Sequence, residues 1–213
     1  MLLAFLLPAA AIAQGSAPVH PAKETILLKE DFDGQPRITV PEYNYGDTAF
    51  ANVRDGHYVL DAKKAGRFWA LRLQTPAEFV ARTTVLEMRM KMTADAASGQ
   101  YGILWHTIRT APNVFNEYVF TITSSGKFAV YAKLEDKPYP VIGWTPCDCI
   151  SKGNDAYNTL RIEEWEKGRY RFFINEQMVY EGDLMIPTFT TFGFYSDAHT
   201  VLYVDYVKFA ARE

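Results

Sequence analysis

Carboxylate side chains are the first candidates for chemistry in this 213-residue sequence, and three of them gather in the segment RIEEWE. Two carboxylates can cleave a glycosidic bond when one donates a proton and the other attacks the sugar or activates water. Glu163 and Glu164 are adjacent, so in a strand they point to opposite faces, and Glu166 falls at the following turn. The spacing therefore favours a solvated strand end over a catalytic pair.

Glu87 is a separate candidate within the alternating segment TTVLEMRMKM. Arg89 and Lys91 share its face, because alternate residues of a strand point the same way. Two neighbouring cations favour the ionised carboxylate, whereas a general acid must hold its proton. We therefore expect Glu87 not to act as a general acid, and its strand face is either part of a shallow glycan groove or an ordinary solvated sheet face.

Nucleophile and zinc motifs are missing from the sequence. There is no Gly-x-Ser-x-Gly segment and no cysteine–histidine spacing typical of a catalytic pair. The four histidines lie far apart, at His20, His57, His106 and His199. No histidine has another within four residues, so no zinc site is predicted.

The two cysteines, Cys147 and Cys149, are separated by one residue in the segment TPCDCI. A disulfide between them would close a very small ring and add little stability. Redox-active pairs usually have two intervening residues, and no histidine lies near enough in sequence to complete a metal site. We expect two free or loosely paired thiols in a loop.

Short apolar and aromatic segments, separated by turn signals, fill the chain from residue 24 onward. Tyrosine and phenylalanine contribute 13 and 14 residues, which favours strands. We predict strands at residues 25–32, 57–62, 67–74, 83–92, 101–108, 117–123, 127–134, 139–144, 157–165, 169–175, 177–183, 190–196 and 200–210. No segment has the periodicity of an amphipathic helix. The pattern therefore predicts one all-β domain over residues 24–213, either a sandwich or a barrel.

The order of these segments resembles the concanavalin A-like lectin/glucanase superfamily, and more narrowly the laminin-G-like domains of secreted bacterial proteins. The matching segments are EDFDG, DGHYVLDA, YGILWH, NEYVFTITSSGKFAVY, GWTPCDCISKGNDAYNTLRI, RFFINEQMVYEGD and FGFYSDAHTVLYVDYVKF. The resemblance covers nearly the whole predicted domain and implies a two-sheet antiparallel jelly-roll β-sandwich. In RFFINEQMVYEGD, Asn175 suits a hairpin turn because its short side chain tolerates left-handed backbone, so we interpret this tip as scaffold.

The resemblance also bears on activity. Glucanases of this superfamily carry Glu and Asp at alternate positions of one strand, and the segment that would match, VLEMRMKM, has one acid, Glu87. The resemblance therefore implies non-catalytic recognition of a carbohydrate or cell-envelope glycan. A structural or protein-interaction module is the first alternative, and a glycosidase or sugar lyase with an atypical site is the second.

No cofactor is predicted, although many domains of this superfamily bind a structural calcium ion. The candidate ligands are Asp31, Asp33 and Asp205, which would meet if the first and last strands paired. The first two aspartates suit a turn equally well.

Sugars are recognised by flat aromatic side chains combined with planar polar groups. The sequence offers four tryptophans, at Trp69, Trp105, Trp144 and Trp165. We predict ligand-binding residues on an outward strand face, at Glu87, Arg89, Trp105, His106, Glu117 and Tyr131. For Trp105 and His106, the alternative is a position in the core.

The first twenty residues, MLLAFLLPAAAIAQGSAPVH, predict export. An apolar run ends in Ala11-Ile12-Ala13, which predicts a signal peptide over residues 1–13 and a linker over 14–23. The run is too short to span a bilayer comfortably. The net charge of −3, with both signs interspersed, indicates no nucleic-acid partner. We therefore expect a periplasmic or extracellular protein, not inserted in a membrane, whose partner is a glycan or an envelope protein.

Overall fold

A computed structural model describes residues 23–34, 38, 40–63, 69–74, 83–94, 99–112, 114–135, 137–184 and 191–212. The predicted signal peptide and the predicted linker up to residue 22 lie outside these residues. The described part contains fifteen strands: β1 Glu24–Glu30, β2 Tyr43–Asn44, β3 Phe50–Arg54, β4 His57–Ala62, β5 Trp69–Gln74, β6 Thr84–Ala94, β7 Gln100–Ala111, β8 Val114–Thr123, β9 Lys127–Leu134, β10 Lys137–Pro146, β11 Asn158–Glu166, β12 Arg169–Ile174, β13 Gln177–Asp183, β14 Thr191–Ser196 and β15 Thr200–Arg212. No helix of this part is long and apolar enough to cross a membrane.

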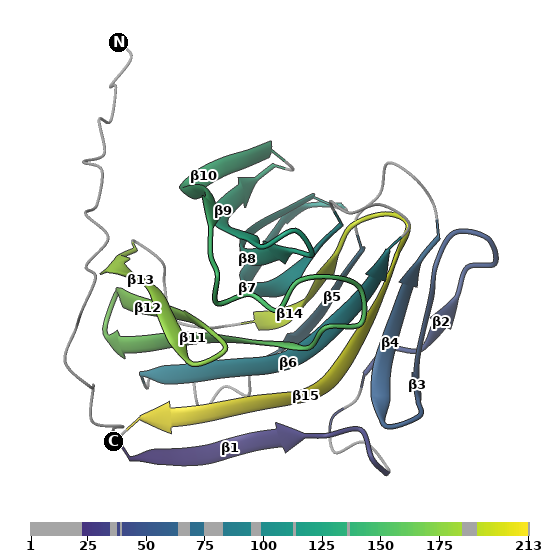
Figure 1. Cartoon of the computed structure of the whole chain (residues 1–213), viewed down its shortest axis with the longest axis horizontal. Coiled ribbons are helices and arrows are strands. Elements are labelled where there is room, and N and C mark those ends of the chain that lie inside the picture. The colour runs from purple at the N-terminus through teal and green to yellow at the C-terminus, as the bar shows by residue number, and fades with distance from the viewer. Residues whose placement is uncertain are drawn as a thin grey trace.

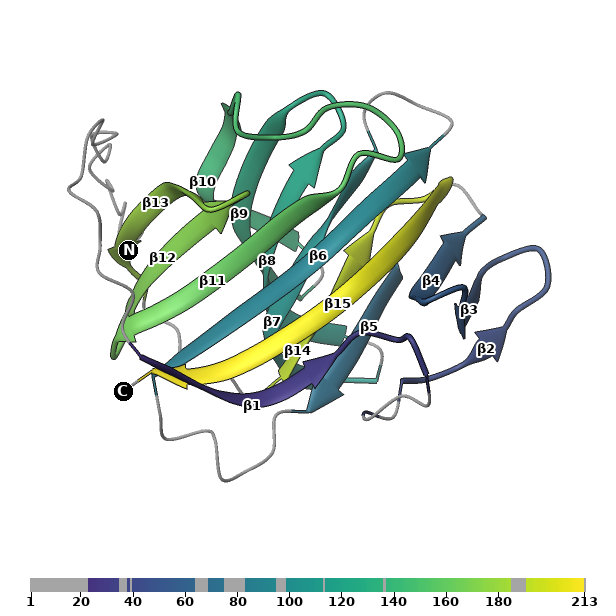
Figure 2. The same cartoon turned by 60° about the horizontal axis from the view of Figure 1, so that its bottom comes forward.

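The strands form two antiparallel sheets that lie face to face (Figures 1 and 2). The nine-stranded sheet has the order β13-β12-β11-β6-β15-β4-β3-β2, and β1 also pairs with β15. The six-stranded sheet has the order β10-β9-β8-β7-β14-β5. The long β15 lies beside β6 on one side, while its first part pairs with β4 and its second part with β1 on the other. The predicted two-sheet antiparallel jelly-roll β-sandwich is confirmed.

The core fills the space between the two sheets, because each sheet turns one set of alternate residues inward. From β6, Leu86, Met88 and Met90 are fully buried in this core. From β7, Trp105 packs on Phe172 of β12, with ring centroids 5.6 Å apart. The alternation read from the sequence therefore identified the inward face of β6.

Most predicted strands are present, and the differences lie at their ends and near the N-terminus. The strands β7 and β10 extend beyond the predicted ranges at both ends. The short strands β2 and β3 were missed; β3 pairs with β4 through a two-residue turn at Asp55 and Gly56. Both turn residues have positive φ angles, which is the signature of a tight hairpin.

The hairpin tip between β12 and β13 is anchored by Asn175, whose φ angle is 48°. Its Oδ1 accepts a hydrogen bond from the Thr159 backbone N–H at 2.8 Å. Its Nδ2 donates to the carbonyl of Cys149 and to Oδ1 of Asn158, both at 2.8 Å. The tip therefore ties the edge hairpin to the cysteine loop, as expected of scaffold.

The expectation of free or loosely paired thiols is wrong, because Cys147 and Cys149 form a disulfide. The loop that carries them is fixed by backbone hydrogen bonds, including one from Cys147 N–H to the carbonyl of Gly126 at 3.0 Å. Both cysteines pack against the core. These anchors hold the two thiols close enough to bond although one residue separates them.

Candidate functional site

A second apolar cluster lies on the face of the six-stranded sheet that points away from the core. On β9, Phe128 and Val130 point into the core, so Ala129, Tyr131 and Lys133 point outward. The cluster consists of Leu104, Val119 and Tyr195, with Tyr131 packed against it. Its three central side chains, those of Leu104, Val119 and Tyr195, are almost fully buried on this face. The outward face of this sheet is therefore folded into a groove.

This groove contains a pocket of about 380 Å³, here called the β9–β10 pocket. Its described lining residues are Gln100, Ala129, Tyr131, Lys133, Pro138, Pro140, Ile142, Gly143, Trp144 and Tyr195. The volume lies within the range of pockets that hold small ligands. The floor comes from β9 and β14, and the wall comes from β10.

The wall is irregular because β10 is an edge strand that pairs with β9 alone. Pro138 and Pro140 lack backbone N–H groups and are tolerated at a sheet edge. The register with β9 shifts twice, after Pro140 and after Ile142. Trp144, which is 45% exposed, lies within the second shift, between Ile142 and Thr145. A tryptophan ring open to solvent beside a pocket is suited to stack on the apolar face of a sugar.

A buried ion pair closes one end of the pocket floor. Glu117 on β8 lies directly opposite Lys133 on β9, with Oε1 and Nζ 3.5 Å apart. The two residues are 1% and 5% exposed. Thr107 also donates a hydrogen bond to Glu117 at 3.4 Å. Lys133 lines the pocket, whereas Glu117 does not.

Hydrogen bonds link the phenol groups of Tyr131 and Tyr195 to the carboxylate of Asp197. The phenols of Tyr131 and Tyr195 are hydrogen-bonded, and Tyr195 donates to Oδ1 of Asp197 at 2.8 Å. Burial, together with the charges of Asp197 and Glu117, raises the pKa of Tyr131 to about 12. Burial also raises the pKa of Tyr195 and that of the Asp197 carboxyl. Both phenols therefore remain neutral near pH 7 and can donate or accept hydrogen bonds.

The structure places the six predicted ligand-binding residues in three different regions. Glu117 and Tyr131 lie together at the pocket. Trp105 is fully buried in the core, and His106 occupies a bulge of β7, where it is 6% exposed and has a φ angle of 51°. Glu87 and Arg89, which complete the set, lie on the outer face of the other sheet. The six do not form one site, and their role in ligand binding stays a prediction.

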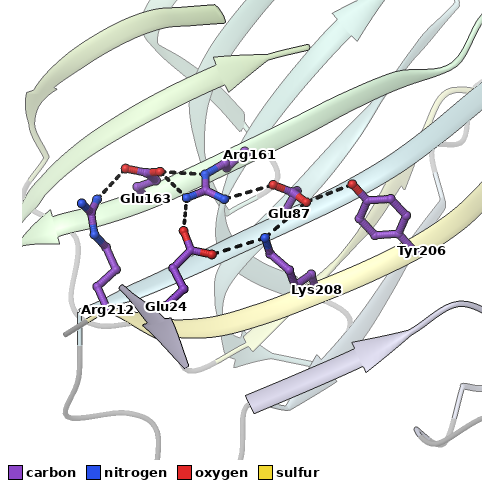
Figure 3. Close-up of polar contacts among 7 residues, drawn as sticks. All are labelled: Glu24, Glu87, Arg161, Glu163, Tyr206, Lys208 and Arg212. Carbon is purple, nitrogen blue, oxygen red and sulfur yellow. Dashed lines mark hydrogen bonds and ion pairs between the residues drawn. The ribbon is translucent and has the colours of Figure 1, made fainter. Parts of the chain in front are cut away.

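Glu87 belongs to a cluster of charged side chains on the outer face of the nine-stranded sheet (Figure 3). It accepts hydrogen bonds from Tyr206 at 2.9 Å and Arg161 at 3.1 Å, and its Oε1 lies 3.5 Å from Nζ of Lys208. Arg161 also pairs with Glu24 and, at 2.7 Å, with Glu163. Burial opposes the charge on Glu24, but Arg161 and Lys208 lower its pKa. These residues satisfy one another. The expectation of a solvated strand end is wrong for Glu163 and Glu164, which are 6% and 2% exposed.

The candidate calcium ligands do not come together. The first and last strands do pair, as that alternative required. However, Asp205 bonds Arg89 at 2.6 Å and lies 3.9 Å from Nε2 of His57. Among the described residues there is no group of three His, Cys, Asp or Glu side chains that could hold a metal ion.

Of the residues that line the pocket, Tyr131 was selected from the sequence, whereas Lys133, Trp144 and Tyr195 were not, and neither was Asp197, which is hydrogen-bonded to Tyr195. A signal for Lys133 was available, because the Ser124-Ser125-Gly126 turn fixes the register of β8 on β9 and sets Lys133 opposite Glu117. Tyr195 and Asp197 join the site through the pairing of β14 with β7, which lies about ninety residues earlier in the chain. No local pattern encodes that pairing.

Known proteins are similar to this chain in fold, at sequence identities of 9–12%. No protein-family model matches the chain, and no curated protein matches it in sequence. The catalytic domain of an endo-1,3-beta-glucanase (laminarinase) from Thermotoga petrophila is similar, with a TM-score of 0.59 and 12% identity over 91% of this chain and 100% of that one. A protein of unknown function with a galectin-like fold from Bacillus subtilis has a TM-score of 0.61 and 9% identity over 91% and 100%. The carbohydrate recognition domain of Emp47p has a TM-score of 0.58 and 10% identity over 87% and 95%.

These structures share the two-sheet sandwich, and the chain therefore has the concanavalin A-like, galectin-like jelly-roll fold. The narrower laminin-G-like resemblance is not among these findings and remains a prediction.

Proposed function

We propose that the β9–β10 pocket binds a carbohydrate and that the protein is a non-catalytic glycan-recognition domain. The observation that carries this proposal is the exposed Trp144 ring beside a floor of neutral phenols and the Lys133 ammonium group. A sugar has apolar C–H faces that stack on aromatic rings and hydroxyls that need donors and acceptors. The fold supports the proposal by analogy, since structures that share it include a carbohydrate recognition domain and a glucanase.

The composition of the pocket favours recognition over hydrolysis. Glycosidases use two carboxylates on either side of the scissile bond. No carboxylate is among the described residues that line the pocket. Glu117, which pairs with the lining residue Lys133, is almost inaccessible. A bound sugar would therefore meet donors and aromatic surface.

A glycosidase is the second candidate, and Asp197 is the observation that favours it. Its carboxyl group is partly buried, accepts a hydrogen bond from Tyr195, and has a raised pKa. A raised pKa suits a general acid. The substitution Asp197→Asn separates the two candidates: it would abolish cleavage by a hydrolase, whereas a recognition domain shows no cleavage before or after the change.

We further propose that the protein is exported to the periplasm or beyond, because residues 1–13 have the pattern of a signal peptide. Its ligand would then be a glycan of the cell envelope or of the surroundings.

The test of the proposed function is a thermal-shift and calorimetry screen against oligosaccharides, with and without calcium. A ligand at 100 times its dissociation constant stabilises the folded state by about 2.7 kcal/mol, which gives a clear shift in melting temperature. For the sugar that binds, we expect Trp144→Ala to weaken affinity at least ~10-fold.

Tyr139→Ala is the matched control for this substitution. Tyr139 is 50% exposed on the same strand but does not line the pocket, so its loss should leave affinity unchanged. Equal losses in both variants, or no binding by any oligosaccharide, would contradict the proposal and favour a protein-interaction module.

A further inference from the structure

The pairing of charges at the β9–β10 pocket affects whether the pocket can bind a charged or a neutral sugar. Of the described residues that line it, Lys133 is the one that carries a positive charge. That charge is already matched by Glu117, which lies 3.5 Å away and is buried. The ammonium group therefore offers hydrogen bonds to a ligand but no unbalanced positive charge.

A second carboxylate, that of Asp197, contacts the pocket residue Tyr195 without lining the pocket. Asp197 holds the hydroxyl of Tyr195, which in turn contacts Tyr131. The described groups at the pocket thus comprise one ammonium and two carboxylates, with neutral phenols between them. Both carboxylates act on Tyr131, because each of their charges contributes to its raised pKa. The charges of both carboxylates therefore act on the phenol that lies at the floor of the pocket.

An acidic sugar would bring a further negative charge into this pocket. Its carboxylate would lose water against Trp144, Pro138, Pro140 and Ile142, and the nearest cation is already paired. A desolvated charge without its own counter-ion is costly. A neutral sugar meets no such cost, since its hydroxyls can accept from Lys133 and exchange hydrogen bonds with Tyr131 and Tyr195.

We propose that the β9–β10 pocket binds neutral sugar units in preference to uronic acids. The Glu117–Lys133 ion pair determines this selectivity. In this arrangement Glu117 acts as a positioning and charge-balancing residue, and Lys133 makes the contact with the sugar. The inference rests on the proposed glycan-binding function and specifies the class of ligand.

The experiment measures dissociation constants for matched pairs of probes with the whole protein. The probes are β-1,3- and β-1,4-linked glucose and mannose tetrasaccharides and the same molecules oxidised at C6 to uronic acids. Each pair keeps its linkage and ring shape and differs in charge. We expect the neutral member to bind at least ~10-fold more tightly than its acidic partner.

The substitution Glu117→Gln tests whether the Glu117–Lys133 ion pair determines the selectivity. It removes the negative charge that lies 3.5 Å from the Lys133 ammonium group, so the preference for neutral over acidic probes should fall at least ~10-fold or reverse. Asp197→Asn, at a less buried position, removes the other carboxylate and should shift the preference in the same direction, which keeps the inference testable if Glu117→Gln does not fold. Asp183→Asn, whose side chain is exposed on β13 of the other sheet, is the control and should leave the ratio unchanged.

Two failures can be told apart. If acidic probes bind the unchanged protein as tightly as neutral ones, or if neither carboxylate substitution changes the ratio, the selectivity inference is wrong and glycan binding stands. If no probe of either kind binds, the proposed function is wrong and the selectivity inference falls with it.

Discussion

Glu117 and Lys133 lie directly opposite each other on β8 and β9, with their charged atoms 3.5 Å apart and almost no exposure to solvent. A pair of this kind adds little net stability, because desolvation offsets much of the attraction. It does leave each partner dependent on the other. The pair therefore links the stability of the six-stranded sheet to the chemistry of the pocket.

The substitution Lys133→Met should destabilise the protein by about 3 kcal/mol, because it removes the ammonium group that pairs with the buried Glu117 carboxylate. The double variant Glu117→Leu/Lys133→Met removes both charges and should recover most of that loss. Urea unfolding of the single and double variants measures the difference. A double variant no more stable than Lys133→Met would show that the two charges are not coupled.

Alkaline pH should destabilise the fold through its buried phenols. The pKa of Tyr131 is raised from 10 to about 12 by burial first and by Asp197 and Glu117 next. The folded state therefore holds the proton after the unfolded state has lost it, so this stability is present below pH 10 and is lost as the pH rises toward 12. Tyr131→Phe should reduce the slope of unfolding free energy against pH between 10 and 11 by about 1 kcal/mol per pH unit. An unchanged slope would contradict this account.

Asn175→Ala should lower stability by about 3 kcal/mol, since it removes three hydrogen bonds and puts a side chain without local polar contacts at a positive φ angle. Asn175→Gly separates the two causes, because glycine adopts that φ angle freely and loses the hydrogen bonds alone. It should be less destabilised than Asn175→Ala by about 1 kcal/mol. Glycan affinity, measured by calorimetry, should not change in either variant.

The double substitution Cys147→Ser/Cys149→Ser should change the melting temperature by a few degrees. The disulfide closes a loop with one intervening residue, for which chain entropy gives about 1–2 kcal/mol. In a domain of this size that corresponds to a shift of about 3–6 °C. Differential scanning calorimetry measures it, and a fall of more than ~10 °C would show that the bond holds the loop against the core more strongly than its length suggests.

Sequence patterns predicted the fold well because they depend on alternation within single strands. The inward residues of β6 and the outward pair Glu117 and Tyr131 follow from period two and from one tight turn. The short strand β3 was missed because Phe50–Arg54 has no clean alternation, and β2 because it has two residues. The disulfide was missed because an argument from ring size ignored the hydrogen bonds that fix the loop.

The pocket could be predicted in part. Alternation identifies the residues that share one face of a strand, but it does not identify the sheet to which the strand belongs. Glu87 and Glu117 were therefore assigned to one surface, although they lie on opposite sheets. The wall depends on two register shifts of β10, and the floor depends on β14 meeting β7. Both are long-range features, set by how whole strands pack.

The position of β15 has a consequence for how the protein forms during synthesis. This strand is made after every other described strand, yet it lies inside the nine-stranded sheet between β6 and the strands β1 and β4. The ribosome must therefore release residues 200–212 before that sheet can close. The nine-stranded sheet is thus completed only after residues 200–212 have been made, and until then β1, β4 and β6 lack the strand that joins them.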